Sequence, residues 1–290
     1  MSAGRDGSDL AAAVRSAVTA DPAVTWGVRV LDLSDRRVLA EHAPDAVLPL
    51  ASVGKVLMLV EVARAVGDGT LRLDEPLRRT PADWVADSGL WQHLATDTLP
   101  VEDLAALVGA VSDNLATNVL LSRIGLDRVA ATAAALGLEH TALLDRVRDV
   151  RTADDPPTLS RGTARELTDL LARLARGRVV SAPVAARVLR WLGLGTDTSM
   201  VASAWRLDPL AHTEPDRGLV LHHKTGTDAG VRADVGVLHG PGASVAYAVT
   251  ACWDPAGPDL RATALAGMAS IGRLIGRHVD DLGTGVHPHR

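Results

Sequence analysis

The hydrophobic pattern near both ends of the chain is typical of β-strands. Residues 24–33 alternate apolar and polar side chains, as a half-buried strand does, and a polar turn then precedes a second candidate strand at 38–42. These two segments can pair as an antiparallel hairpin. Towards the other end, turns rich in Gly, Asp and Pro separate three apolar runs, at 218–224, 233–239 and 244–253. The pattern therefore predicts five strands.

Apolar residues recur at helical spacing in the rest of the chain. One helix is predicted at residues 9–19, and a long final helix at 260–281 carries Met268, Ile271 and Leu274 in its apolar stripe. Between the two groups of strands, the pattern is almost entirely helix and loop. The helices predicted there cover residues 52–66, 101–111, 118–124, 127–136, 163–176 and 183–192.

This order of elements favours one α/β (α+β) arrangement. A mainly antiparallel five-stranded sheet is built from both ends of the chain, flanked by the terminal helices, with an all-helical insertion between its halves. We expect a discontinuous sheet subdomain at 1–47 and 203–290 and a helical subdomain at 48–202. A ligand site is expected where the two parts meet, because clefts form at such boundaries.

The most informative stretch is a turn that runs into the apolar helix at 52–66. Ser52 and Lys55 are three residues apart, which places them on one helical face, and the apolar run after them indicates that this face is buried. Burial disfavours the charged form of an amine and lowers its pKa. A neutral amine beside a hydroxyl is a base beside a nucleophile. The alternative is that Ser52 caps the helix and Lys55 extends towards solvent.

Composition strengthens the chemical interpretation. Of the 30 Lys and Arg residues, only Lys55 and Lys224 are lysine, the cation whose pKa shifts readily. Lys224 is the first residue of the segment Lys-Thr-Gly-Thr. The alternative interpretation of this segment is a strand edge that meets a turn. The chain has two Asn residues, Asn114 and Asn118, and Asn114 belongs to a Ser-Asp-Asn segment. The alternative interpretation of this segment is a polar turn that caps the following helix.

Three short motifs follow one another in a set order. They are Ser-x-x-Lys at 52–55, Ser-Asp-Asn at 112–114 and Lys-Thr-Gly at 224–226, the signature of class A β-lactamases and penicillin-binding proteins. Nearly the whole chain resembles the β-lactamase-related serine hydrolases of the class A group, and the stretches at 88–90 and 231–236 fit the same subgroup. The resemblance implies a β-lactamase-like fold and a serine hydrolase.

The resemblance also implies catalytic roles. Ser52 would attack an amide or ester carbonyl and become acylated, with Lys55 as the base. Ser112 would pass a proton to the departing nitrogen, because a hydroxyl both accepts and donates. The backbone N–H groups of Ser52 and Thr227 would form an oxyanion hole. Gly226 would let the strand edge approach the substrate closely.

Other positions would bind the substrate. Asn114 would bond Lys55 and the amide of the substrate. Lys224 and Thr225 suit a substrate carboxylate, so we expect a β-lactam or another carboxylate-bearing amide or ester. Lys224 would also have a catalytic role, because it raises the positive potential near Ser112. Arg232 either adds a second carboxylate contact or lies solvated at a strand end.

One departure from the family pattern concerns the loop that carries the Glu that activates water for deacylation. The corresponding segment, 147–157, holds no Glu, and Glu166 lies in the next predicted helix. Asp149 either substitutes for it at a shorter reach or pairs with Arg148 or Arg151 as ordinary loop electrostatics. Without a placed base, we predict that acylation proceeds and hydrolysis of the acyl-enzyme is slow.

Two alternatives to this hydrolase remain. The enzymatic alternative is an acyltransferase, peptidase or esterase that acts on a small metabolite. The non-enzymatic alternative is a catalytically weak penicillin-binding module, in which the inherited site is little used. Reactivity of Ser52 towards an acylating probe separates the two classes.

Charge and composition limit the kinds of partner and cofactor that we expect. A net charge of −5 leaves no basic excess to neutralise phosphates, so no nucleic-acid partner is expected. The charged N-terminus lacks an apolar signal core, and no apolar run reaches roughly 18 residues, so we expect a cytoplasmic protein without membrane contact. The single cysteine, Cys252, excludes an internal disulfide. The His spacing indicates no metal, and we expect a monomer without cofactors.

Overall fold

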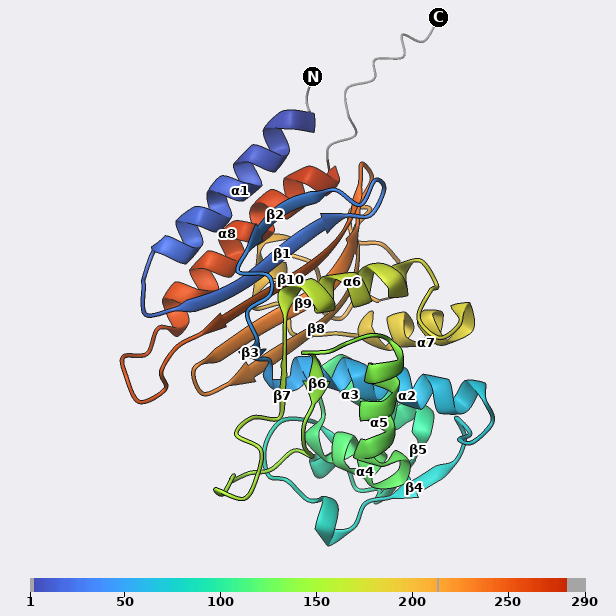
Figure 1. The fold of residues 1–290 in the computed structure, drawn as a ribbon. Coiled ribbons are helices and arrows are strands. Elements are labelled where there is room, and N and C mark those ends of the chain that lie inside the picture. The colour runs from blue at the N-terminus through green and yellow to red at the C-terminus, as the bar shows by residue number, and fades with distance from the viewer. Residues whose placement is uncertain (1–2, 213, 281–290) are drawn as a thin grey trace, which may run out of the picture.

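The computed structural model describes residues 3–212 and 214–280, with side chains from residue 8 onward. Its centre is a five-stranded sheet with the order β2-β1-β10-β9-β8, in which all neighbours are antiparallel (Figure 1). The predicted sheet, built from both ends of the chain, is confirmed. Its strands are β1 (Thr25–Asp32), β2 (Val38–His42), β8 (Val220–Asp228), β9 (Val231–His239) and β10 (Ser244–Cys252).

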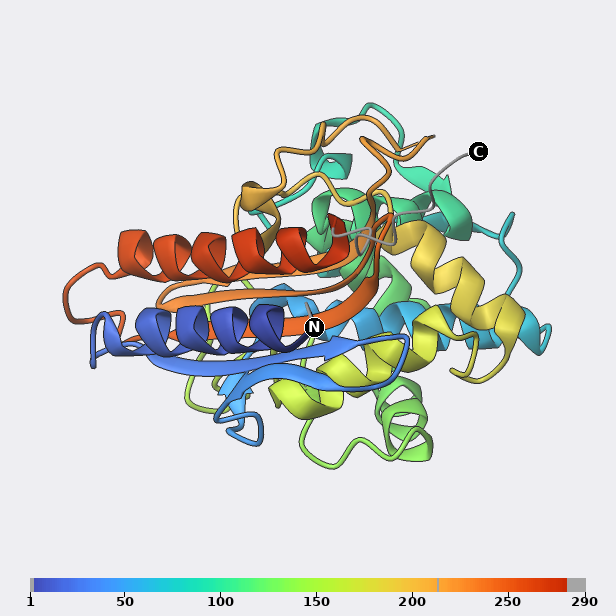
Figure 2. The same cartoon turned by 90° about the horizontal axis from the view of Figure 1, so that it is seen from above.

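Two terminal helices cover one face of this sheet. Helix α1 (Ala3–Thr19) and helix α8 (Arg261–Asp280) lie side by side over it, as Figure 2 shows. The core between them and the strands contains the buried side chains of Trp26, Tyr247 and Met268. The predicted covering by terminal helices is thus confirmed, whereas residue 281, the predicted end of the last helix, lies outside the described residues.

The helices of the middle segment pack against the opposite face. Helix α6 (Ala164–Ala175) contacts β1, β9 and β10, and α2 (Lys55–Gly67) forms the centre of the second core, with nearly every side chain buried. The other helices surround α2 or complete the layer. They are α3 (Val101–Val111), α4 (Asn114–Ile124), α5 (Leu126–Ala135) and α7 (Ala182–Leu192).

The middle segment differs from the expected all-helical insertion in containing five short strands. Two or three residues are too few to show a strand period, so the sequence pattern does not reveal them. Three form one small sheet and two form another. They are β3 (Leu48–Pro49), β7 (Ser160–Gly162) and β6 (Ala142–Leu143), and β4 (Pro76–Arg78) with β5 (Thr98–Pro100). Four 3₁₀ turns complete the fold, η1 (Ala51–Gly54), η2 (Pro81–Asp83), η3 (Trp91–His93) and η4 (Val201–Ala204).

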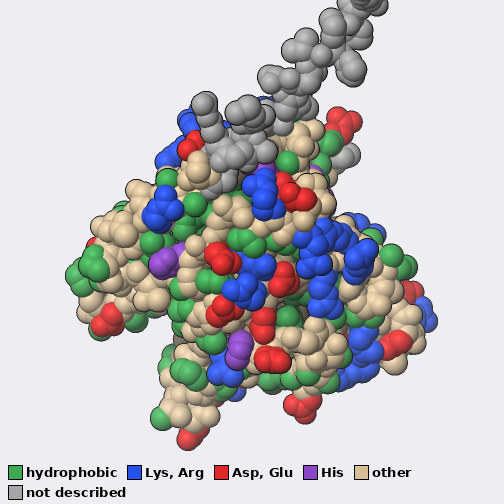
Figure 3. Space-filling model, turned by 45° about the horizontal axis from the view of Figure 1, so that its top comes forward, with side chains coloured by type: hydrophobic (Ala, Val, Ile, Leu, Met, Phe, Trp, Pro, Cys, Tyr) green, Lys and Arg blue, Asp and Glu red, His purple; other side chains and the backbone are tan. Residues whose placement is uncertain are grey.

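The surface mixes charges of both signs. On the face in Figure 3, basic side chains gather on one side, and acidic and basic side chains alternate elsewhere. Both lysines are buried, so the basic side chains on this surface are arginines. Within the described ranges, no helix combines the length and the hydrophobicity needed to cross a membrane.

Candidate active site

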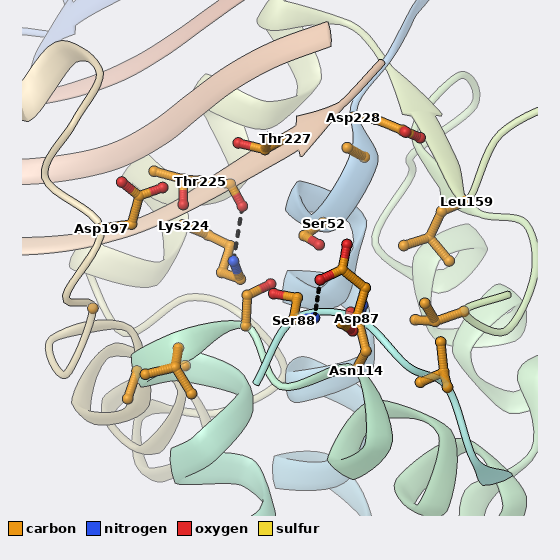
Figure 4. Close-up of a pocket in the computed structure, with 18 of the residues that line it drawn as sticks. Ser52, Asp87, Ser88, Asn114, Leu159, Asp197, Lys224, Thr225, Thr227 and Asp228 are labelled. Carbon is orange, nitrogen blue, oxygen red and sulfur yellow. Dashed lines mark hydrogen bonds between the residues drawn. The ribbon is translucent and has the colours of Figure 1, made fainter. Parts of the chain in front are cut away.

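A cavity of about 450 Å³ lies where the sheet meets the helical layer. Its walls come from β8, the turn η1, the corner between α3 and α4, and three loops (Figure 4). Side chains from all three sequence motifs meet in it, although they lie up to 173 positions apart in the chain. The predicted site residues that line it are Ser52, Ser112, Asn114, Lys224, Thr225 and Thr227.

Ser52 lies in the 3₁₀ turn η1, immediately before α2, rather than within the α-helix. The turn is held by its neighbours. Ala51 adopts a left-handed conformation with φ 47°, and its carbonyl accepts a 2.6 Å hydrogen bond from Ser160 Oγ. A Cβ on Gly54 would lie 2.2 Å from the Cβ of Ser160, so only glycine fits there. The half-buried side chain of Ser52 is therefore fixed at the cavity wall.

Lys55, the first residue of α2, is fully buried, which rules out extension to solvent. Its Nζ lies 2.6 Å from the Ser112 carbonyl, 2.6 Å from Asn114 Oδ1 and 3.1 Å from Ser112 Oγ. The two carbonyl oxygens only accept hydrogen bonds, but a hydroxyl can also donate. A protonated amine donates to all three oxygens, whereas a neutral amine donates to the two carbonyls and can accept from the Ser112 hydroxyl.

Burial and charge both favour that neutral amine. Burial lowers the pKa of Lys55 well below 10.5, the positive charge of Lys224 lowers it further, and the carboxylate of Asp113 opposes part of the shift. The buried amine expected from the sequence is thus present. Its contacts place it beside Ser112 and Asn114.

The corner between α3 and α4 is built around Asp113. Its Oδ1 accepts a 2.9 Å bond from Ala116 N and so caps α4, while Oδ2 accepts bonds from Leu90 N and Trp91 N at 2.7 and 2.8 Å. This cap starts α4 four residues earlier than the helix predicted from residue 118. The preceding residue, Ser112, is left-handed with φ 58°, a conformation that costs a non-glycine residue about 1–3 kcal/mol and clusters at functional sites.

Asn114 ties the corner to the loop above it. Its Oδ1 accepts the bond from Lys55, and its Nδ2 donates a 2.5 Å bond to the Asp87 carbonyl. Its backbone N–H donates to the Ser88 carbonyl at 3.0 Å. One N–H of the side-chain amide is left to contact a ligand.

Lys224 is buried in β8, and its Nζ donates a 2.8 Å bond to the Thr225 carbonyl. Burial lowers its pKa to about 8, although the carboxylates of Asp197 and Asp234 act in the opposite direction. Burial raises the pKa of Asp197, but hydrogen bonds from Ser199 and the nearby Thr225 hydroxyl outweigh this and hold the pKa below its usual value. In Figure 4 the carboxylate of Asp197 lies next to Thr225.

Gly226 brings the sheet edge against the turn η1. A Cβ at this position would lie 2.2 Å from the Leu50 carbonyl oxygen and 3.1 Å from Ser52 N, so the two backbones touch. Strand β8 continues to Asp228, four residues beyond the predicted strand end, because Asp228 still pairs with Val231 of β9. The Lys-Thr-Gly motif therefore lies inside a strand.

Arg232 is one predicted site residue that the structure does not bring to the cavity. It lies in β9 opposite Thr227, and its guanidinium stacks over Trp253 at 5.8 Å from the ring centroid. Its Nη1 donates to the carbonyls of Val231 and Asp228 at 2.6 and 3.0 Å. These contacts account for its burial without a ligand.

The loop that lacks Glu contributes Asp149 to the cavity. The expected pairing of Asp149 with Arg148 or Arg151 is wrong, because both arginines contact Asp145, at 2.7 and 2.6 Å. Asp149 instead accepts a bond from Ala86 N at 2.9 Å to Oδ1 and 3.2 Å to Oδ2.

Glu166 lies in α6, as expected, where its carboxylate accepts bonds from the backbone of residues 139 and 140. It does not line the cavity.

Asp87, Asp197 and His223 are among the cavity residues outside the sequence motifs. Asp87 and Asp197 lie in loops, and no spacing marks them as functional. His223 precedes Lys224 on β8, and its Nδ1 lies 3.3 Å from Asp234 Oδ1. Across the described part of the chain, no group of three or more His, Cys, Asp or Glu side chains is arranged to hold a metal ion.

Comparison with known proteins identifies the fold. It is similar to a β-lactamase from Sphaerobacter thermophilus DSM 20745, with 26% identity, a TM-score of 0.80 and coverage of 94% of this chain and 97% of that one. It is also similar to PBP-A (22% identity, TM-score 0.77, 92% and 94% covered). A class A β-lactamase from Mycobacterium abscessus matches with 22% identity, a TM-score of 0.75, and 92% and 98% covered.

The family model described as "Beta-lactamase enzyme family" matches residues 9–279, which is nearly the whole chain. The resemblance expected from the three motifs is therefore confirmed. The chain belongs to the β-lactamase enzyme family.

Proposed function

We propose that this protein is a serine hydrolase of the class A β-lactamase type, acylated at Ser52 by a β-lactam or a related amide or ester. The observation that carries the proposal is the buried Lys55 amine, which contacts Ser112 and Asn114 at the cavity that Ser52 lines. A base with a lowered pKa next to a hydroxyl is the arrangement that activates a nucleophile.

Acylation would proceed in two steps. Ser52 Oγ forms a bond to the carbonyl carbon while its proton moves to Lys55 Nζ, and the carbonyl electrons move onto the oxygen. The backbone N–H groups of Ser52 and Thr227 would donate to that oxyanion, since the Gly226 contact holds β8 against η1. The C–N bond then breaks, and the departing nitrogen receives the proton by way of Ser112 Oγ, which lies 3.1 Å from Lys55 Nζ.

Deacylation is proposed to be slow. Water must add to the acyl carbon, the ester bond to Ser52 must break, and Ser52 must recover a proton. The loop at 147–157 supplies no Glu to activate that water. Its cavity-lining carboxylate, Asp149, already accepts a backbone bond from Ala86. General base catalysis contributes about 10²–10⁴-fold, so its absence would slow hydrolysis by that order.

A structural relative supports the choice of ligand. A point mutant of PBP-A, with 21% identity and a TM-score of 0.78, is described as an acyl-enzyme complex with penicillin G. We therefore take benzylpenicillin as the first probe for this chain.

Incubation with benzylpenicillin is expected to give a covalent adduct on Ser52 with the mass of one intact β-lactam. Because hydrolysis lacks a placed base, the adduct should accumulate and persist while turnover of a chromogenic cephalosporin stays slow. Intact-mass spectrometry over time and absorbance measurements test both parts. If neither an adduct nor hydrolysis appears, the β-lactam form of the proposal fails.

Gly226→Ala is expected to slow acylation of Ser52 by about 10²-fold, the order that a displacement of about 1 Å costs a reacting geometry. The added Cβ would meet the Leu50 carbonyl at 2.2 Å, so β8 must move away from η1. Adduct formation rates compare the variant with wild type. Gly257→Ala is the control, because its nearest contact would be an ordinary 3.4 Å. A Gly226→Ala protein with the wild-type rate would show that this contact does not set the geometry.

A further inference from the structure

We infer that His223 is a positioning residue for acylation, because its ring fixes the spacing between the two sides of the cavity. One side is the corner between α3 and α4, which carries Ser112, and the other is the part of β8 that carries Lys224. The inference rests on the proposed function, since it concerns the substrate that spans these two groups during acylation of Ser52. It arises from the contacts of His223, a buried cavity residue that takes no part in the proposed proton transfers.

Asp234 holds the His223 ring in one orientation. The Nδ1 of His223 lies 3.3 Å from Asp234 Oδ1 and is the donor of this contact, because a carboxylate only accepts. Asp234 is itself fixed, since it accepts bonds from the Tyr247 hydroxyl and from Val201 N, both at 3.0 Å. The three side chains are buried, where a hydrogen bond is electrostatically stronger than in water. The ring therefore cannot turn without breaking a buried contact.

The sheet leaves room for this network at Gly236, which pairs with His223 of β8 on one side and with Tyr247 of β10 on the other. A Cβ on Gly236 would lie 2.8 Å from the His223 Cβ and 2.8 Å from the Tyr247 hydroxyl oxygen. Asp234 is two residues before Gly236, so it lies on the same face of the sheet. Because glycine has no side chain, both partners can reach Asp234.

The far edge of the His223 ring supports the cavity wall at Gly195. A Cβ on Gly195 would lie 2.9 Å from both Cδ2 and Nε2 of His223, so the ring packs directly against this backbone. The wall continues through Thr196 to Asp197, which Figure 4 shows next to Thr225. His223 thus determines how close this segment comes to β8.

The same segment is bonded to the other side of the cavity. Both the backbone N–H and the hydroxyl of Thr196 donate to the Ala110 carbonyl, at 2.9 and 3.1 Å. Ala110 lies in the last turn of α3, two residues before Ser112. The segment 195–197 therefore bridges the two sides of the cavity, because it is bonded to α3 and packs on His223. Loss of the ring contact would let the two sides change their spacing.

A double-mutant cycle tests this contact. His223→Asn keeps a donor for Asp234 but removes the ring edge, whereas Gly195→Ala forces the added Cβ against the fixed ring. We expect each variant to slow adduct formation with benzylpenicillin about 10-fold, because a displacement of about 1 Å costs about 10²-fold and these changes are smaller. Independent effects would multiply to about 100-fold. Because the alanine methyl can fill the space that the ring edge leaves, the double variant should be slowed by at most about 10-fold.

His222→Asn is the matched control, because it makes the same substitution in the neighbouring residue. His222 is half-buried and its Nδ1 donates a 2.9 Å bond to the Leu189 carbonyl, but it does not line the active-site cavity. Its substitution should lower the free energy of unfolding while the rate of adduct formation stays within about 2-fold of wild type. His223→Thr, which favours a strand and also lacks the ring edge, replaces His223→Asn in the cycle if that variant does not fold.

A small uncharged fluorophosphonate is the second probe, because it reacts at Ser52 without spanning the cavity. Its labelling rate should stay within about 2-fold of wild type in every variant. The inference is overturned if the effects of His223→Asn and Gly195→Ala multiply, if neither variant slows the β-lactam, or if fluorophosphonate labelling slows equally. Absence of labelling of the wild-type protein by both reagents would instead reject the proposed function.

Discussion

Ser52→Ala is expected to abolish covalent labelling by benzylpenicillin and by a fluorophosphonate. Removal of a nucleophilic serine from a hydrolase costs on the order of 10⁶-fold in turnover, which places the remaining reaction below detection here. The substitution removes one oxygen from a half-buried side chain at the cavity wall, so the fold should persist. Intact-mass spectrometry gives the adduct, and thermal unfolding confirms that the variant is folded.

Ser203→Ala is the matched control, because this exposed serine lies in η4 and its hydroxyl bonds only to the Met200 carbonyl three residues earlier. It should be unlabelled at position 203 and fully labelled at Ser52. Equal labelling of Ser52→Ala and wild type would place the nucleophile elsewhere. That result would favour the binding module over the hydrolase.

The fold follows from patterns that are long enough to show a period. Strands β1, β8, β9 and β10 have eight or nine residues, and their apolar runs separate cleanly from the turns around them. The strands of the middle segment have two or three residues and leave no such trace. The early start of α4 depends on the Asp113 cap, which is a single side-chain contact.

The sequence predicted those site residues that belong to a motif with short spacing or that are of a rare type in this chain. The chain has two lysines, and both are buried at the cavity, as the sequence suggested for Lys55. Asp197 was not predictable, because it comes to lie near Thr225 at the cavity only through the placement of a distant loop beside β8. The predicted pairing of Asp149 was wrong for a related reason. Asp149 is next to Arg148 and near Arg151 in sequence, but both arginines contact the buried carboxylate of Asp145 instead.

The three sequence motifs and the residues around Lys224 therefore give different information about the site. The three motifs are the basis for the proposed acylation at Ser52, whereas the groups around Lys224 are known only from the cavity that they line. Asp197 lies beside Thr225 at the cavity wall, and the guanidinium of Arg232 stacks over Trp253 and does not line the cavity.

Lys55→Met is expected to slow acylation of Ser52 by about 10²–10⁴-fold, the usual contribution of a general base. Methionine has a similar length and is apolar, so it fits among the buried side chains of α2. The carbonyl of Ser112 and the Oδ1 of Asn114 each lose one donor, at a cost of about 1–3 kcal/mol per buried group. Urea unfolding should show this loss of stability in a protein that still folds.

The pH dependence distinguishes a base from a merely structural lysine. Protonated Lys55 cannot accept the Ser52 proton, so the wild-type rate should rise with pH as Lys55 deprotonates and then level off. Because burial lowers the pKa of Lys55, the plateau should begin well below 10.5, the pKa of an ordinary lysine. Lys55→Met should lose this rise, and Lys55→Arg should stay slow throughout, since a guanidinium keeps its proton. A Lys55→Arg protein that acylates at the wild-type rate would show that Lys55 supplies charge and not a base.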